Sequence, residues 1–497
     1  MDLKIGFFPF LIGYYVLYFF GIWVYRHYKS KEIDSRHNEN QDTNSRYNEV
    51  ESEQRYNELE SSNLPRRHHN FPHLRDLFFN IPAITGILLG LSSFWFHPVL
   101  EDDWYRFFWD GLLFSKGISP YAKAPIKFFQ DMQFSEYSQI LSGINYPDWK
   151  TIYFPVFQYL FRIAQFFDSS SYNGLRFVVL VGTLLFLVLL SREVSRSVFL
   201  FLFICPFLWK ETVFSIHFDI WIGLGLLLFY KSYLQQSMYA TGILLGILVC
   251  SKPYCIIFFP LLLPIFQKHG HQFPAAAPSG IALSPFRNSS LPKKNTNISA
   301  NQYLWKNSLS NLISFFLTSI LLCIPFWEGN AFHFFESFLS FPHGFEFNSI
   351  YYAVLKFLVP AKLAILASYF LYLVCWCVLY FLLWRKKILT VSFFYYSLLL
   401  FFLFSPVFNP WYYLAILPFW VMGPTLKPSG WVLLFVFPLQ YFTPIYVPHL
   451  GLFGAYDHPN ALRILSIFLE GTSVFLDFYG FFQKNRDLKS IFSNQEC

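Results

Sequence analysis

Three adjacent carboxylates, Glu101, Asp102 and Asp103, directly follow an apolar segment that ends near Leu100. Ionisable groups at the point where a chain leaves a membrane are costly to bury and are therefore functional candidates. Asp102 or Asp103 could act as a general base that removes the proton of a hydroxyl group, and repulsion between the two predicts a raised pKa for one of them. We favour Asp103 as the base. The alternative is that one of the two forms an ion pair with Arg106.

Further polar side chains stand close to the ends of other apolar segments. Lys252 interrupts an apolar stretch directly before Pro253, where its ammonium group could bind a phosphate. Alternatively, Lys252 extends towards the membrane interface. Glu211, His217 and Asp219 could bind sugar hydroxyls or a divalent cation, or they could make helix caps and helix–helix contacts. No spacing of Cys and His residues matches a zinc site, so the sequence assigns no metal site and requires no cofactor.

The composition indicates a polytopic membrane protein. Hydrophobic residues make up 55% of the 497-residue chain and charged residues 13%, whereas a soluble domain has about 25% charged residues. Because a spanning helix takes roughly 20 apolar residues, we predict an all-α fold with about twelve or thirteen spans. The long apolar runs lie at about 5–25, 77–98, 173–190, 213–232, 308–326, 361–384, 389–404, 428–447 and 461–482, and shorter runs lie near 152–167, 196–209, 239–249, 253–267 and 409–424.

Composition also divides the chain into segments. Residues 1–31 carry an apolar run and a basic flank without the small-residue cleavage pattern of a secretory signal, so we expect an uncleaved span. Residues 32–76 are polar and contain a short tandem repeat, which predicts a disordered cytoplasmic linker. The transmembrane catalytic domain is expected at 77–482, with a long first external loop at 99–150, and a cytoplasmic tail at 483–497.

Basic flanks predict the orientation of the spans. The clusters of Lys and Arg fall on one side if the spans alternate, and that side should be the cytoplasm. This scheme requires 152–167 to be a helix at the outer interface instead of a span. The polar groups near the membrane boundaries then converge on one external site. The net charge of +7 is dispersed over loops and helix ends, which argues against nucleic acid as a partner.

Several segments of the external loop resemble the membrane glycosyltransferases of the GT-C superfamily. Trp109–Gly111 and Gly117–Pro125 resemble a loop motif of the bacterial enzymes, with Ser119 in place of the usual Asn. Asn145–Pro147 and Thr151–Gln158 resemble the helix that lies downstream of this loop motif in those enzymes, together with the residues before it. The resemblance continues in motif order over about residues 77–480, outside the linker and the first span.

Three later segments carry the same resemblance. Lys210–Asp219 resembles the start of a family helix, with Ile216 where a Gly is common. Phe347–Tyr352 and Phe408–Tyr413 resemble two further motifs, whose aromatic residues could stack on sugars or flank a polyprenyl chain. Interfacial anchoring by Trp and Tyr would explain these aromatic residues equally well.

The resemblance implies a GT-C-like fold with juxtamembrane helices in the first external loop and an acidic residue of that loop as the catalytic base. It also implies transfer of a hexose, possibly mannose, from a polyprenyl-phosphate donor to a glycan or lipid acceptor, with inversion at the anomeric carbon. The bacterial polyprenol-phosphomannose-dependent mannosyltransferases are similar in this respect. The protein would lie in a bacterial inner membrane, in contact with membrane lipids, and its active site would face the periplasm. The expected substrate-binding residues are Arg106, Trp109, Asp110, Tyr121, Glu211, His217, Asp219, Lys252, Asn348, Tyr351, Asn409 and Trp411.

Two other functions compete with this interpretation. A transporter or flippase of lipid-linked saccharides would also have many spans and intramembrane charges, but 77–270 and 308–482 show no internal duplication of the kind common in transporters. A ligase or polymerase of surface polysaccharide would use a long external loop rich in Arg and His. Residues 327–358 contain His333 and His343 but no Arg. We therefore favour the hexosyltransferase.

Overall fold

The chain folds into helices throughout the part that the structure describes. No strand is present in that part, and an isolated parallel bridge joins Phe347 to Val407. The all-α class is therefore confirmed for the described residues. The segments predicted at 1–31, 32–76 and 483–497 lie outside the described residues. The computed structural model describes residues 81–98, 102–267, 300–327, 346–348, 350–424, 426–434, 436, 465–466 and 468–480.

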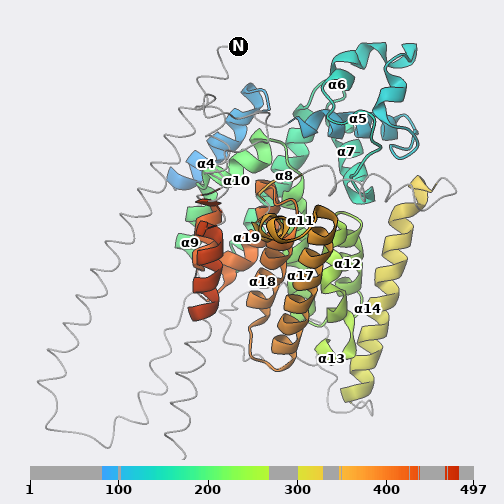
Figure 1. Ribbon diagram of the computed structural model, residues 1–497. Coiled ribbons are helices and arrows are strands. Elements are labelled where there is room, and N and C mark those ends of the chain that lie inside the picture. Colours follow the sequence, from blue (N-terminus) through green and yellow to red (C-terminus); the bar gives the residue numbers. More distant parts are fainter. Residues whose placement is uncertain are drawn as a thin grey trace, which may run out of the picture.

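The helices form a body of roughly parallel elements with a smaller lobe at one end (Figure 1). The body contains α8 (Asn173–Leu190), α9 (Arg196–Phe203), α10 (Pro206–Trp209), α11 (Asp219–Leu234), α12 (Ala240–Val249), α13 (Pro264–Gln267), α14 (Ala300–Cys323), α16 (Ile350–Leu358), α17 (Ala361–Trp384), α18 (Thr390–Phe404) and α19 (Tyr413–Met422). The lobe contains α5 (Asp103–Ser115), α6 (Ser138–Ser142) and α7 (Pro155–Phe167), and α4 (Ile81–Ser92) precedes it. Short 3-10 helices are η1 (Ser93–Trp95), η2 (Pro125–Phe128), η3 (Met132–Tyr137), η5 (Pro253–Leu262), η7 (Ile324–Phe326) and η9 (Pro410–Tyr412), and η4 (Lys210–Phe214) is a π-helical turn.

Among the described residues, three helices are long and apolar enough to cross a membrane. They span Asn173–Leu190, Gln302–Phe326 and Ala361–Trp384, and the pair Arg196–Phe203 and Pro206–Phe214, bent by 48°, is a further candidate. All four coincide with apolar runs predicted from the sequence, while the total of twelve or thirteen spans stays a prediction. Shorter apolar helices lie at Ile84–Trp95, Ala240–Val249, Pro253–Leu262 and Thr390–Phe404.

Two of these helices expose most of their apolar surface. Leu317 and Ile320 of α14 are 55% and 60% exposed, and Leu366 and Phe370 of α17 are 66% and 64% exposed. Apolar faces of this extent are unfavourable in water and are typical of contact with lipid. In contrast, α18 is buried on nearly all sides. The exposed faces therefore support a membrane protein in which α18 lies inside the helix bundle.

Small residues bring α12 and α14 close together. The backbone N–H of Gly242 donates to Oδ1 of Asn311 at 3.0 Å, and a Cβ atom at Gly242 would lie 1.9 Å from the Asn311 carbonyl oxygen. Gly246, one turn later, would place a Cβ 3.0 Å from the carbonyl oxygen of Phe315. Such pairs of small residues four positions apart allow close packing of membrane helices. They hold α14 against the body.

The lobe is held together by the packing of α5 on α7. The ring of Phe107 stacks on Phe161 with centroids 4.8 Å apart, and a Cβ at Gly111 would lie 2.6 Å from the Phe161 carbonyl oxygen. With 13 residues, α7 is shorter than the roughly 20 residues of a span, as the predicted orientation requires for 152–167. This packing directs the first turn of α5 towards the helix body.

Candidate functional site

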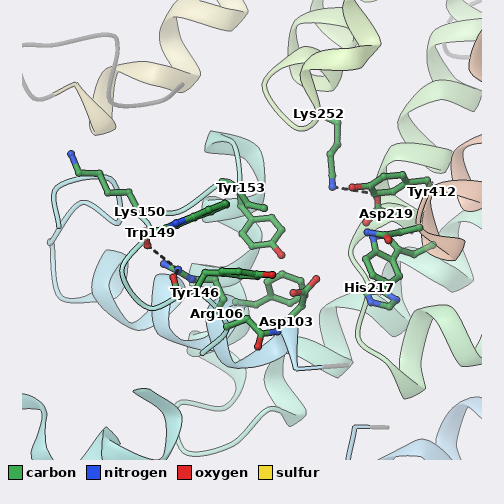
Figure 2. A pocket seen from close by; sticks show the side chains of 15 residues that line it. Asp103, Arg106, Tyr146, Trp149, Lys150, Tyr153, His217, Asp219, Lys252 and Tyr412 are labelled. Carbon is green, nitrogen blue, oxygen red and sulfur yellow. Dashed lines mark hydrogen bonds and ion pairs between the residues drawn. The ribbon is translucent and has the colours of Figure 1, made fainter. Parts of the chain in front are cut away.

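A pocket lies where the lobe meets the helix body (Figure 2). Its walls come from the first turns of α5, the loop 145–153, the start of α11, the break between α12 and η5, and the segment at η9. Seven predicted site residues meet here, as the sequence-based expectation of one converged site requires. The pocket is lined by Asp103, Arg106, Phe107, Asn145, Tyr146, Trp149, Lys150, Ile152, Tyr153, His217, Asp219, Lys252, Asn409, Trp411 and Tyr412.

Of the two candidate bases, Asp103 lines the pocket and Asp102 does not. Asp103 is the first residue of α5, where the helix dipole stabilises a negative charge, and Tyr153 points towards it (Figure 2). The carboxylate of Asp102 instead accepts a hydrogen bond from Nδ2 of Asn145. Burial, followed by the charge of Asp103, raises the pKa of Asp102 to about 6. The predicted repulsion is therefore present, although burial is the larger cause.

Arg106 fixes the loop that forms one wall. Its Nη2 donates to the carbonyl oxygens of Tyr146 at 3.1 Å and Trp149 at 2.9 Å. Burial lowers the pKa of the guanidinium, against the opposing effect of Asp110 and other acids. Tyr146 has a φ of +50°, and its ring stacks on Trp149 with centroids 5.0 Å apart. Arg106 thus holds an aromatic pair in place at the pocket.

Lys252 brings a positive charge into an aromatic setting. It precedes η5, and its Nζ lies 3.6 Å from Oδ1 of Asp219, the first residue of α11. Nζ also lies 5.0 Å from the ring centroid of Tyr412 and 5.6 Å from that of Phe157, within the range of a cation–π interaction. A lysine held in this way can bind a phosphate oxygen as a point charge.

His217 is held from behind by Glu211. Its Nδ1 lies 3.2 Å from Oε2 of Glu211, while Oε1 of Glu211 accepts from Nζ of Lys210 at 3.0 Å. Glu211 belongs to η4, and π-helical turns of this kind often occur at functional sites. The ring of His217 stacks on Trp411 with centroids 3.9 Å apart. Glu211 does not line the pocket and acts on it through His217.

Asp110 lies outside the pocket. Its carboxylate accepts hydrogen bonds from Oγ1 of Thr151 at 2.5 Å and Nε2 of Gln158 at 3.1 Å. Burial raises the pKa of Asp110 to about 6, although the charge of Arg106 and both hydrogen bonds oppose the shift. This network ties α5 to the loop and to α7. Asp110 therefore supports the pocket wall instead of facing a ligand.

Trp109 and Tyr121 also lie outside the pocket. Trp109 is fully buried and packs against Phe128 and Phe134, with ring centroids 5.3 and 5.2 Å away. The hydroxyl of Tyr121 donates to the carbonyl oxygen of Tyr153 at 2.6 Å. Both residues stabilise the lobe.

Asn348 and Tyr351 connect other parts of the body. Nδ2 of Asn348 donates to Oε1 of Glu470 at 3.2 Å, and the ring of Tyr351 stacks on Phe404 with centroids 4.7 Å apart. The neighbouring Phe347 donates its N–H to the carbonyl oxygen of Pro406. These contacts support the segment that leads into η9.

Sequence reasoning did not select all residues of the pocket. Several of them lie in segments that carried the family resemblance, but no single side chain stood out, since loop residues without helical periodicity give no direction. Tyr412 follows the predicted Trp411 directly and could have been included on that ground. The lining residues without a predicted role are Phe107, Asn145, Tyr146, Trp149, Lys150, Ile152, Tyr153 and Tyr412.

The donor set does not fit the divalent cation that the sequence left open. Glu211 and His217 are in contact, but Asp219 pairs with Lys252. Within the described ranges, no group of three or more His, Cys, Asp or Glu side chains is arranged to hold a metal ion.

Comparisons of the chain with protein-family models, with curated proteins and with solved structures find no match. The chemistry of the pocket is therefore argued from its own residues.

Proposed function

We propose that this protein is a membrane hexosyltransferase that moves a hexose from a polyprenyl-phosphate donor to a hydroxyl group of a glycan or lipid acceptor. One observation carries the proposal: a carboxylate, Asp103, and an ammonium group, Lys252, face the same pocket from different walls (Figure 2). Glycosyl transfer needs a base for the acceptor hydroxyl and a positive charge for the leaving phosphate. The pocket offers both next to apolar helices.

The reaction is a single displacement. The acceptor oxygen attacks the anomeric carbon while Asp103 takes its proton. The bond between the anomeric carbon and the phosphate oxygen breaks, and the polyprenyl phosphate leaves with the bonding electrons. Lys252 stabilises the negative charge that develops on this phosphate. Because the acceptor and the leaving group act on opposite faces of the sugar, the anomeric configuration inverts.

The neighbourhood of Lys252 suits a lipid donor. Lys252 directly precedes η5, and Phe259 of η5 packs on Phe315 of α14 with ring centroids 5.2 Å apart. The outer face of α14 is apolar and exposed. A polyprenyl chain can therefore lie along α14 while its phosphate reaches Lys252.

A transporter or flippase of lipid-linked saccharides is the second candidate. The bent pair Arg196–Phe203 and Pro206–Phe214 and the break at Lys252 resemble the discontinuous helices that line transporter sites. Such a protein would bind the lipid-linked sugar without breaking the glycosidic bond, so chemistry separates the two candidates.

The test is transfer of radiolabelled hexose from polyprenyl-phosphate mannose or glucose to membrane acceptors. Membranes would contain wild type, Asp103→Asn, or Glu136→Gln, an exposed acid of the same lobe, at equal protein levels. We expect Asp103→Asn to lower kcat by about 10²–10⁴-fold while donor binding persists, and Glu136→Gln to match the wild type. Full transfer by Asp103→Asn would exclude it as the base. Bound donor without any transfer by the wild type would favour the transporter.

A further inference from the structure

One wall of the pocket presents three buried polar side-chain atoms. They are Nε2 of His217, Oδ1 of Asp219 and Oδ1 of Asn409, and none has a hydrogen-bond partner in the described part of the chain. The three residues are 1%, 4% and 3% exposed. Buried polar atoms are nearly always paired in folded proteins, and an unpaired one costs about 1–3 kcal/mol. Three such atoms on one pocket indicate a ligand that supplies several hydrogen-bonding groups.

The surroundings of each atom show what it can offer a ligand. Glu211 accepts from Lys210, and an ionised carboxylate can only accept, so Nδ1 of His217 donates to Glu211 and Nε2 is left without a partner at the pocket. The Asp219 carboxylate has Lys252 at 3.6 Å, an ion pair beyond hydrogen-bond distance. The Asn409 side chain interacts with the Tyr412 hydroxyl, which leaves its carbonyl oxygen for the pocket. The wall therefore offers a ligand two oxygen acceptors, on Asp219 and Asn409, and the Nε2 atom of His217.

We infer that this polar wall selects a neutral sugar ring whose hydroxyl groups donate to Asp219 and Asn409 and form a hydrogen bond with Nε2 of His217. The inference rests on the proposed function and names the class of sugar that is transferred. A uronic acid would bring a second negative charge next to Asp219. A site built to pair with a hydroxyl rejects analogues that lack it by up to about 10⁴–10⁵-fold, so the wall discriminates among donors.

The first arm of the test uses polyprenyl-phosphate hexoses in which one ring hydroxyl is replaced by hydrogen or by fluorine. Fluorine is polar but cannot donate a hydrogen bond. We expect at least one position where both replacements lower kcat/KM equally, by about 10–100-fold, because the missing donor leaves one buried acceptor unpaired. Recovery by fluorine at every sensitive position would show that the sugar accepts hydrogen bonds there, and would overturn the inference.

The second arm assigns a hydroxyl to His217. His217→Phe keeps a ring on Trp411 and removes Nε2, so the penalty for one deoxy donor should disappear. The penalty should persist in Glu136→Gln, a change of an exposed side chain outside the pocket. Asn409→Leu repeats the measurement at a second residue of the wall if His217→Phe does not fold. Unchanged penalties in both variants, with the wild type active, would overturn the inference and leave the transferase standing. A wild type that transfers no hexose would instead refute the proposed function.

Discussion

The Nζ atom of Lys252 and the Oδ1 atom of Asp219 lie 3.6 Å apart, with side chains 17% and 6% exposed. Removing one partner of a buried pair leaves an uncompensated charge, at a cost of about 3–5 kcal/mol. We therefore expect Lys252→Gln and Asp219→Asn each to lower the melting temperature in detergent, and the double variant to recover most of it. A double variant no more stable than the single variants would contradict this coupling.

The same double variant separates stability from function. Because it lacks the ammonium group that we assign to the donor phosphate, it should fold but fail to bind polyprenyl-phosphate hexose. Donor binding is measured on the purified protein at equal folded concentrations. Normal binding by the double variant would remove Lys252 from the proposed site.

Asp102→Asn should reduce transfer much less than Asp103→Asn. Asn145 holds the Asp102 carboxylate outside the pocket lining, so a change there acts only indirectly on the acceptor hydroxyl. We expect a loss below about 10-fold, against about 10²–10⁴-fold for the base itself. The measurement is kcat at saturating donor. Equal losses in both variants would mean that the two acids work as one unit.

Asp110 gives the folded state a defined dependence on pH. Its pKa rises from 3.8 to about 6 on burial, so between about pH 4 and 6 the folded protein keeps a proton that the unfolded chain has lost. Stability is then greatest at the acidic end of this window, decreases as the pH rises to 6, and is level above it. One pKa unit corresponds to about 1.4 kcal/mol, which gives a decrease of up to about 3 kcal/mol.

Asp110→Asn should reduce this slope. A residual slope of the same sign is expected, because the pKa of Asp102 is also raised to about 6. Melting temperatures between pH 4 and 8 measure both. An unchanged slope in Asp110→Asn would show that the carboxylate titrates in the same way in the folded and unfolded states.

Gly242→Ala should weaken the attachment of α14. Its Cβ would lie 1.9 Å from the Asn311 carbonyl oxygen, and such overpacking typically costs about 1–3 kcal/mol. Gly471→Ala is the control, since a Cβ there meets nothing within 4 Å and alanine favours a helix. We expect a lower melting temperature for the first variant only. Equal melting temperatures would mean that α12 and α14 can separate without loss.

The sequence identifies polar residues that stand beside breaks in apolar runs, and this is how Asp103, Lys252 and Asn409 were found. It does not determine which way a residue inside a helix points. Asp110 lies on the same helix as Asp103 but faces Thr151 and Gln158, a choice made by the packing of α5 on α7. Predicted site residues that stand at a break in an apolar run therefore lie in the pocket. Predicted site residues inside a helix lie wherever the packing of that helix directs them.

The loop 145–153 could not be placed from the sequence for another reason. Arg106 holds it through backbone carbonyl oxygens, and every residue type carries these. The candidate spans were easier to predict, because runs such as 173–190 and 361–384 are apolar along their whole length and length alone is enough.

The candidate spans differ in length, and this links the protein to the thickness of its bilayer. At 1.5 Å per residue, the 25 residues of Gln302–Phe326 reach about 37 Å, and the 18 residues of Asn173–Leu190 reach about 27 Å. A hydrocarbon core is about 30 Å thick, so the longer helix exceeds this thickness and the shorter one falls slightly short of it. Tilt of the helix or a local change in bilayer thickness can accommodate such a mismatch. Because η5 packs on that longer helix and directly follows Lys252, we expect lipids with shorter or longer acyl chains to shift Lys252 and to change donor binding at the proposed site.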